Sequence, residues 1–194
     1  MLRDPEDILT SNGRKYELNE ENLKPLKEYL GEDYKLPDKL LLQVITHKSF
    51  AHGTKPYNER LSFLGEELLK LSASKFVLGK KQVTSGYKFS VGDLNFDSLG
   101  SLTHRLIVTD RVLSEFASAK GIDKVFFCKV ALPQQSSSVT ETKNYKPKAM
   151  YSTITSSLVG AVALQHGKST AERFIQENLL TDILPMVQKV RGGK

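Results

Sequence analysis

The sequence predicts a single all-α domain, and three observations support this fold class. Apolar residues recur at helical spacing in several segments, whereas no segment shows the alternation of apolar and polar residues that is typical of a strand. The sequence has no internal repeat and no second group of core residues. Its 194 residues suffice for one helical bundle with a buried core.

The composition argues against several classes of protein. The longest apolar run, LVGAVAL at 158–164, is far shorter than the roughly 18 residues of a membrane span. The single cysteine, Cys128, excludes an internal disulfide, and the four scattered histidines give no support to a structural zinc site. The opening MLRDPEDIL carries three acids, unlike an organellar transit peptide, so we expect a cytosolic protein or a processed form.

The apolar pattern of the first half of the sequence predicts three helices after an extended segment of about 20 residues. NEENLKPLKEYLG (19–31) has Asn19 as its N-cap and Gly31 as its stop, and the next helix begins at about Pro37. The third helix lies in HGTKPYNERLSFLGEELLKL. The expected buried stripe of this helix consists of Leu61, Leu64, Leu68 and Leu71. Its expected polar face consists of Glu59, Ser62 and Glu66.

The middle of the chain is less regular. Residues 72–90 are expected to continue the third helix and then form a loop, and 91–121 predicts one or two helices that end at Gly121. IDKVFFCKV (122–130) is compatible with a strand or with the end of a helix. The polar, serine-rich segment 131–148 predicts an exposed loop.

Two further helices are expected near the C-terminus. AMYSTITSSLVGAVALQHG is apolar enough to be largely buried, and Gly167 marks its end. A last helix runs from about Ser169 to Leu184, where Pro185 is expected to stop it. A basic tail, QKVRGGK, follows.

Four segments resemble the ribonuclease III family. NERLSFLGEELL matches the family signature NERLEFLGDAVL at eight of twelve positions, and ITHKSFAHG is similar to its THKSY stretch. VGDLNFDSLGSLTHRLIV is similar to its Gly-x-Leu…Leu-Val helix, and SSLVGAVALQHG to its EALIGAIYLDG. The resemblance implies the ribonuclease III endonuclease-domain fold for residues 36–188, preceded by an extension (1–35) and followed by a basic tail (189–194).

The family's chemistry depends on four carboxylates that hold Mg²⁺, which activates water for phosphodiester hydrolysis. The matching positions here are Ser62, Glu66, Thr153 and Ser156, so three of the four carboxylates are replaced. One anionic side chain does not offset the cost of dehydrating Mg²⁺. The resemblance therefore implies a protein that is not an enzyme and has no catalytic residue, metal or cofactor. Because hydroxyl groups do not repel one another as clustered carboxylates do, we expect a fold that is stable without divalent metal.

Three other residues of these motifs have two interpretations each. The resemblance places Glu59 and Phe63 at a dimer interface, whereas the alternatives are a surface ion pair for Glu59 and core packing for Phe63. His47 is either a general base or a hydrogen-bonded structural histidine. We expect the structural role, because no acidic partner is near in sequence.

The net charge of +6 fits a polyanionic partner, and equally a solvated surface with extra lysines. The basic residues concentrate in three segments, and double-stranded RNA is recognised largely through its backbone, which such segments can contact. The candidate RNA-binding residues are Lys80, Lys81, Lys143, Lys146, Lys148, Lys189, Arg191 and Lys194.

The resemblance extends to catalytically inactive ribonuclease III-like proteins of the fungal mitochondrial large ribosomal subunit. It implies a structural role in the mitochondrial matrix, with ribosomal RNA, neighbouring ribosomal proteins and a second ribonuclease III-like subunit as partners. That subunit can be an identical copy or a related ribosomal protein. Two alternatives stay open: the non-acidic half of a double-stranded-RNA endonuclease, and a free RNA-processing or splicing factor.

Overall fold

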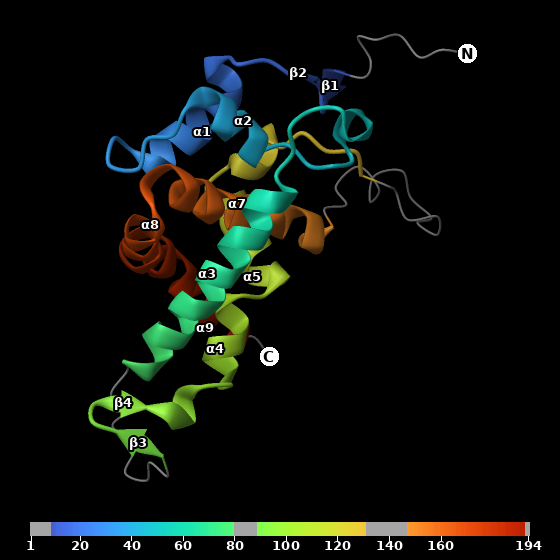
Figure 1. Ribbon diagram of the computed structural model, residues 1–194. Coiled ribbons are helices and arrows are strands. Elements are labelled where there is room, and N and C mark those ends of the chain that lie inside the picture. The colour runs from blue at the N-terminus through green and yellow to red at the C-terminus, as the bar shows by residue number, and fades with distance from the viewer. Residues whose placement is uncertain (1–8, 80–88, 131–146, 193–194) are drawn as a thin grey trace, which may run out of the picture.

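Helix α7 (Lys148–His166) runs through the middle of the molecule and packs chiefly against α3 (Glu59–Leu78) and α5 (Asp110–Ala119) (Figure 1). The computed structural model describes residues 9–79, 89–130 and 147–192. In these residues the fold is the predicted all-α bundle, with only short strands. Almost every residue of α7 between Tyr151 and Val162 is buried, as expected for a helix with neighbours on all sides. The helix ends at Gly167, as predicted.

The segment before residue 36 contributes to the same core. A hairpin of β1 (Thr10–Ser11) and β2 (Arg14–Lys15) precedes α1 (Glu20–Leu30). The predicted caps of α1 are confirmed. The side chain of Asn19 accepts from the backbone N–H of Asn22, and Gly31 takes the positive φ of 61° that favours glycine. This helix buries Leu23, Leu26 and Leu30.

Helix α2 (Asp38–Val44) begins directly after Pro37, as predicted, and a short 3₁₀ turn (Phe50–Gly53) leads to α3 (Glu59–Leu78). The leucine stripe expected for α3 is only half right. Leu61 and Leu68 are buried, but Leu64 and Leu71 are 39% and 40% exposed. The buried face is rotated toward the small residues of the helix, namely Ser62, Gly65, Ser72 and Ala73. Ser62 was therefore wrongly assigned to the polar face.

Two glycines explain this rotation, because they let α3 and α7 touch backbone to backbone. A β-carbon on Gly65 would clash with the carbonyl oxygen of Ser156 and lie 2.9 Å from the amide nitrogen of Gly160. A β-carbon on Gly160 would in turn clash with the carbonyl oxygen of Leu61. No side chain fits at this crossing, so the smallest residues of α3 must face α7.

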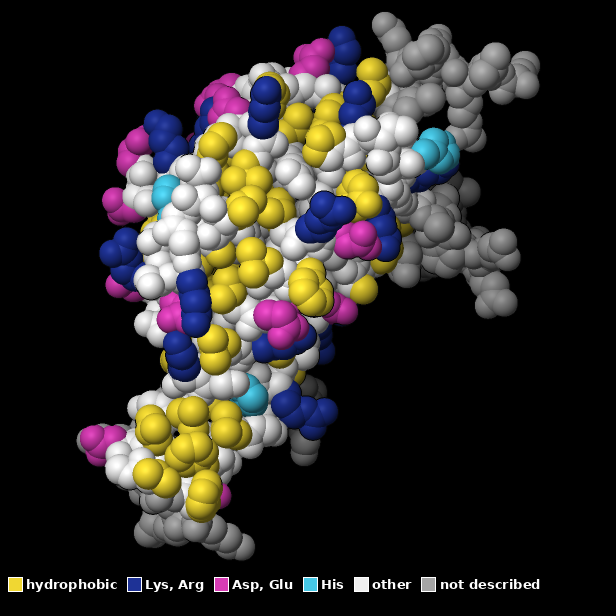
Figure 2. Space-filling view, viewed as in Figure 1, with side chains coloured by type: hydrophobic (Ala, Val, Ile, Leu, Met, Phe, Trp, Pro, Cys, Tyr) yellow, Lys and Arg dark blue, Asp and Glu magenta, His cyan; other side chains and the backbone are white. Residues whose placement is uncertain are grey.

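The segment after α3 contains a β-hairpin that the sequence did not predict. Strands β3 (Ser90–Val91) and β4 (Leu94–Asn95) pair in antiparallel fashion, and a 3₁₀ turn (Phe96–Ser98) follows. These strands are too short to show an alternating pattern in the sequence. Apolar side chains gather on the surface of this region (Figure 2), and the exposed ones are Phe89, Val91, Leu94, Leu99 and Leu102.

Helices α4 (Leu102–Ile107) and α5 (Asp110–Ala119) complete the central part of the chain. Gly121 adopts a left-handed conformation just after α5, where the sequence predicted a stop. A 3₁₀ turn (Ile122–Val125) then leads into extended chain, and Phe127 pairs with Thr46 in a parallel bridge. The ambiguous segment 122–130 is thus a helical turn followed by strand-like backbone.

The C-terminal helices differ from the prediction at the proline. Helix α8 (Lys168–Phe174), a π-helical turn (Ile175–Leu179) and α9 (Leu180–Gly192) run on in succession. Pro185 lies inside α9 and does not end it. An internal proline costs about 3 kcal/mol, and the buried side chains of Ile183 and Val187 on either side of it offset this cost by anchoring the helix. No helix in the described parts of the chain has the length and apolar character to cross a bilayer.

The α3–α7 crossing yields a stability prediction. We expect Gly65→Ala to lower the free energy of unfolding by about 3 kcal/mol or more, because a methyl group would push two helix backbones apart. Gly192→Ala is the control, since nothing lies within 4 Å of that position, and it should stay within about 0.5 kcal/mol of the original protein. Urea unfolding measures both, and equal stability of the two variants would contradict the packing described.

Candidate functional site

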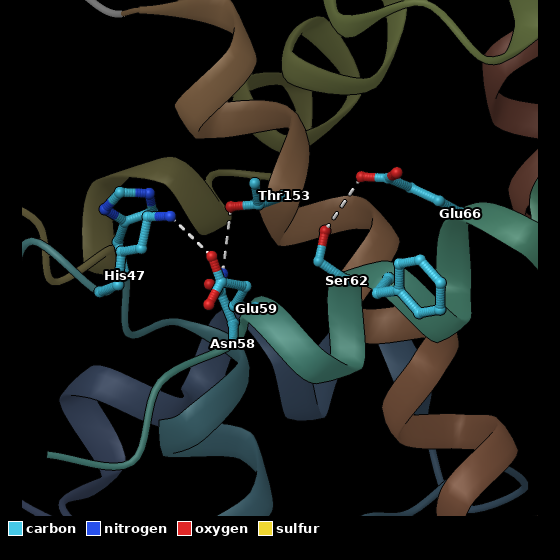
Figure 3. A pocket seen from close by; sticks show the side chains of 8 residues that line it. His47, Asn58, Glu59, Ser62, Glu66 and Thr153 are labelled. Carbon is cyan, nitrogen blue, oxygen red and sulfur yellow. Dashed lines mark hydrogen bonds and ion pairs between the residues drawn. The ribbon is translucent and has the colours of Figure 1, made fainter. Parts of the chain in front are cut away.

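A pocket of about 240 Å³ lies between the first half of α3 and the first turns of α7 (Figure 3). It collects most of the residues that the family motifs singled out. Its lining consists of His47, Lys48, Asn58, Glu59, Ser62, Phe63, Glu66 and Thr153. Three of the four positions that match the family's carboxylates therefore meet in one place, together with both candidate interface residues.

Asn58 is a buried residue of the pocket wall, and its role was not predicted from the sequence. Its side-chain nitrogen donates to the hydroxyl of Thr153 (3.1 Å) and to the carbonyl of Val44 (3.2 Å). Its backbone N–H donates to the carbonyl of Thr46 (2.9 Å). One side chain thus joins α3 to both α2 and α7. Its position at the head of the NERLSFLGEELL motif was the only available signal.

The hydroxyl groups at the matched positions are already engaged within the protein. Ser62 Oγ donates to Glu66 Oε1 over 3.3 Å, one helical turn along α3. Thr153 Oγ1 donates to the carbonyl of Met150 over 2.6 Å. Ser156 does not line the pocket: it is buried, and its carbonyl lies against Gly65 at the helix crossing. Ser156, the fourth matched position, therefore contributes to the packing of the two helices and not to the pocket.

The two carboxylates of the pocket differ in their surroundings. Glu59 forms an ion pair with Lys48 over 2.6 Å, and this hydrogen bond is the main reason why the pKa of Glu59 is lowered. Glu66 makes no ion pair with any described residue. The surface ion pair considered for Glu59 is thus present, with Lys48 as its partner. The pocket thus retains one carboxylate, that of Glu66, which is in no ion pair with a described residue.

His47 has the geometry of a structural histidine. Its Nδ1 accepts from the backbone N–H of Ser49 over 3.1 Å and lies 2.9 Å from the Ser49 hydroxyl. The backbone N–H of His47 donates to the carbonyl of Phe127 over 2.9 Å. Burial lowers the pKa of His47, and the neighbouring Lys48 ammonium lowers it further. The neutral imidazole is therefore the favoured form in the folded protein.

Phe63 is 70% exposed, so the core-packing alternative for this ring is wrong. It belongs to the lining of the pocket. Leu64 and Leu71 are the other exposed apolar side chains of α3. The interface role of Phe63 and Glu59 remains a prediction.

Three of the eight candidate RNA-binding residues lie in described parts of the chain. Lys148 is the exposed first residue of α7. Lys189 and Arg191 are exposed near the end of α9, where Arg191 Nη1 donates to Thr103 of α4 over 3.2 Å. The other five lie outside the described residues: Lys80, Lys81, Lys143, Lys146 and Lys194. The described candidates thus occupy two places, the start of α7 and the end of α9.

Comparison with known proteins identifies the class. The family model described as ribonuclease-III-like matches residues 37–183, so the chain belongs to the ribonuclease III-like family. The fold agrees with this: the solved nuclease domain of ribonuclease III from Campylobacter jejuni superposes with a TM-score of 0.58 at 20% identity, covering 86% of this chain and 99% of that one.

Of two relatives of this chain, one is named as a ribonuclease and the other as a ribosomal protein. Ribonuclease 3 of Bdellovibrio bacteriovorus is 29% identical over 174 residues, which cover 87% of this chain and 64% of the relative. Large ribosomal subunit protein mL57 of Neurospora crassa is 27% identical over 146 residues, covering 70% of this chain and 52% of the relative. The chain thus matches between half and two thirds of the length of these relatives.

The state of His47 yields a pH prediction. Because its pKa in the folded protein lies below the unfolded value of about 6.5, its contribution to stability is present above that pH and is lost as the pH falls through the folded-state pKa. We expect His47→Asn, which keeps an acceptor for the Ser49 N–H, to lose less stability than the original protein between about pH 7 and about pH 5. Urea unfolding at both pH values measures this, and parallel losses would contradict it.

Proposed function

We propose that this chain is a non-catalytic ribonuclease III-like domain that serves as a structural constituent of the mitochondrial large ribosomal subunit. In this role it binds ribosomal RNA and a second ribonuclease III-like protein. The RNA binding rests on the basic surface and on the family, and the ribosomal role rests on the Neurospora relative. The mitochondrial location rests on the family resemblance.

The donor groups of the pocket carry the non-catalytic part of this proposal, because they do not fit Mg²⁺. A magnesium ion requires several oxygen ligands with anionic charge and loses its water reluctantly. Glu66 offers one carboxylate, and Glu59 is engaged by the Lys48 ammonium. The hydroxyl protons of Ser62 and Thr153 are donated inside the protein. In the described parts of the chain no group of three or more His, Cys, Asp or Glu is placed to hold a metal.

The exposed side of α3 supports the proposed protein partner. Phe63, Leu64 and Leu71 present apolar surface along a single helix, and aromatic side chains often dominate the energy of an interface. Glu59 and Lys48 lie on the same pocket rim and can contribute polar contacts. The partner is an identical copy or a related ribosomal protein.

A second candidate function comes from the enzymatic relatives. The Bdellovibrio relative is named as a ribonuclease, and a chain with an incomplete acidic set can serve beside a partner that has a complete one. In this role the present chain would be the non-acidic subunit of a double-stranded-RNA endonuclease. The Neurospora relative favours the ribosomal role.

Purification of the tagged protein from its native cells, followed by sedimentation, tests the ribosomal role. We expect the protein to sediment with the large ribosomal subunit, together with ribosomal RNA. Mg²⁺-dependent cleavage of duplex RNA by the purified complex would instead support the endonuclease, provided that the cleavage is lost when the partner's acids are replaced. RNA crosslinks confined to other transcripts would support a processing or splicing factor and contradict the ribosomal proposal.

The fit of the pocket to Mg²⁺ is tested by thermal unfolding. We expect the Tm of the isolated protein to be the same with and without millimolar Mg²⁺, because a ligand stabilises a fold only by binding to it. The double variant Ser62→Glu, Thr153→Asp adds two carboxylates beside Glu66 and should gain a Tm that rises with Mg²⁺. A clear rise in the Tm of the unaltered protein would contradict the proposal, whatever the variant does.

A further inference from the structure

A second cavity, of about 330 Å³, lies between α5 and the start of α7, and it shares no lining residue with the pocket between α3 and α7 described above. It is lined by Arg111, Ser114, Glu115, Ser118, Lys148 and Tyr151. We propose that this cavity binds a backbone phosphate of RNA, held between the guanidinium of Arg111 and the ammonium of Lys148. The inference rests on the RNA binding proposed above and assigns it to a particular place.

The charges of the cavity support this assignment. Arg111 and Lys148 are both exposed, and neither forms an ion pair within 4.0 Å with any described carboxylate. Glu115 lines the same cavity and lies four residues from Arg111 on α5, but it is bonded to neither cation. By contrast, Lys27 on α1 lies between two carboxylates, those of Glu20 and Asp38. The two cations of the cavity are thus available for an external anion.

The other polar groups of the lining already have partners within the protein. Ser114 Oγ donates to the carbonyl of Arg111 over 3.1 Å, and Ser118 Oγ donates to Asp123 Oδ2 over 2.9 Å. Tyr151 is buried, with its hydroxyl 3.9 Å from the sulfur of Cys128. These contacts fix the walls, so an incoming group would meet mainly the charged side chains of Arg111, Lys148 and Glu115.

The chemistry of the two cations fits a phosphodiester. The planar guanidinium of arginine can donate to two phosphate oxygens at once, while lysine acts as a compact point charge. The first turn of α7 contains no acidic residue, so the positive end of its helix dipole adds to the field of these side chains.

RNA fits the cavity better than an acidic protein does. The lining has no exposed apolar side chain that could anchor a protein partner. Contacts to an RNA backbone need only cations and polar groups. The net charge of +6 favours a polyanion in the same way.

The test measures the affinity of the full chain for an RNA duplex by fluorescence anisotropy at several salt concentrations. We expect the double variant Arg111→Gln, Lys148→Gln to bind about tenfold or more weakly, and the slope of log K against log salt to fall by about one for each lost phosphate contact. Lys24→Gln is the matched control, because Lys24 is an exposed lysine of α1 that is paired with Glu28. It should leave both quantities unchanged.

A second variant tests the sign of the charge effect. Glu115→Gln removes the one carboxylate of the lining and should tighten RNA binding, an effect that a merely structural role of Glu115 would not produce. Equal Tm values for all variants would show that the fold is intact. If the unaltered protein binds no RNA, the proposed function is wrong. If it binds RNA and the double variant keeps both its affinity and its salt slope, the phosphate site alone is wrong.

Discussion

The contact between the backbones of α3 and α7 is the constraint on which the rest of the molecule depends. Gly65 and Gly160 leave no room for a side chain at the crossing, so the relative position of the two helices is fixed by main-chain atoms. Ser62 lies one turn from Gly65, and Thr153 lies two turns from Gly160. The shape of the pocket is therefore set by the crossing of the two helices.

Much of the fold could be predicted because its signals are local. Asn19, Gly31 and Gly167 mark helix ends through their own backbone chemistry, and the structure places the ends there. The face of α3 and the continuation of α9 through Pro185 could not be predicted in this way. Both depend on the helices that pack against them, and tertiary packing overrides periodicity and propensity.

The candidate site was predicted in part. The family motifs singled out Ser62, Glu66 and Thr153, and these residues do line one pocket, because matching motif positions occupy matching places in a shared fold. The pairing of Lys48 with Glu59 could not be predicted, because the two residues are eleven positions apart in the sequence and meet only through the turn before α3. In the sequence, the cavity between α5 and α7 was indicated by Lys148 alone, because Arg111 comes from a different helix.

The apolar surface over the β3–β4 hairpin and the exposed side of α3 has a consequence for solubility. Large exposed apolar patches promote self-association, and exposed side chains such as Phe63, Phe89 and Val91 are of this kind. A net charge of +6 opposes the association through mutual repulsion, which added salt screens. We therefore expect self-association of the purified chain to increase with ionic strength.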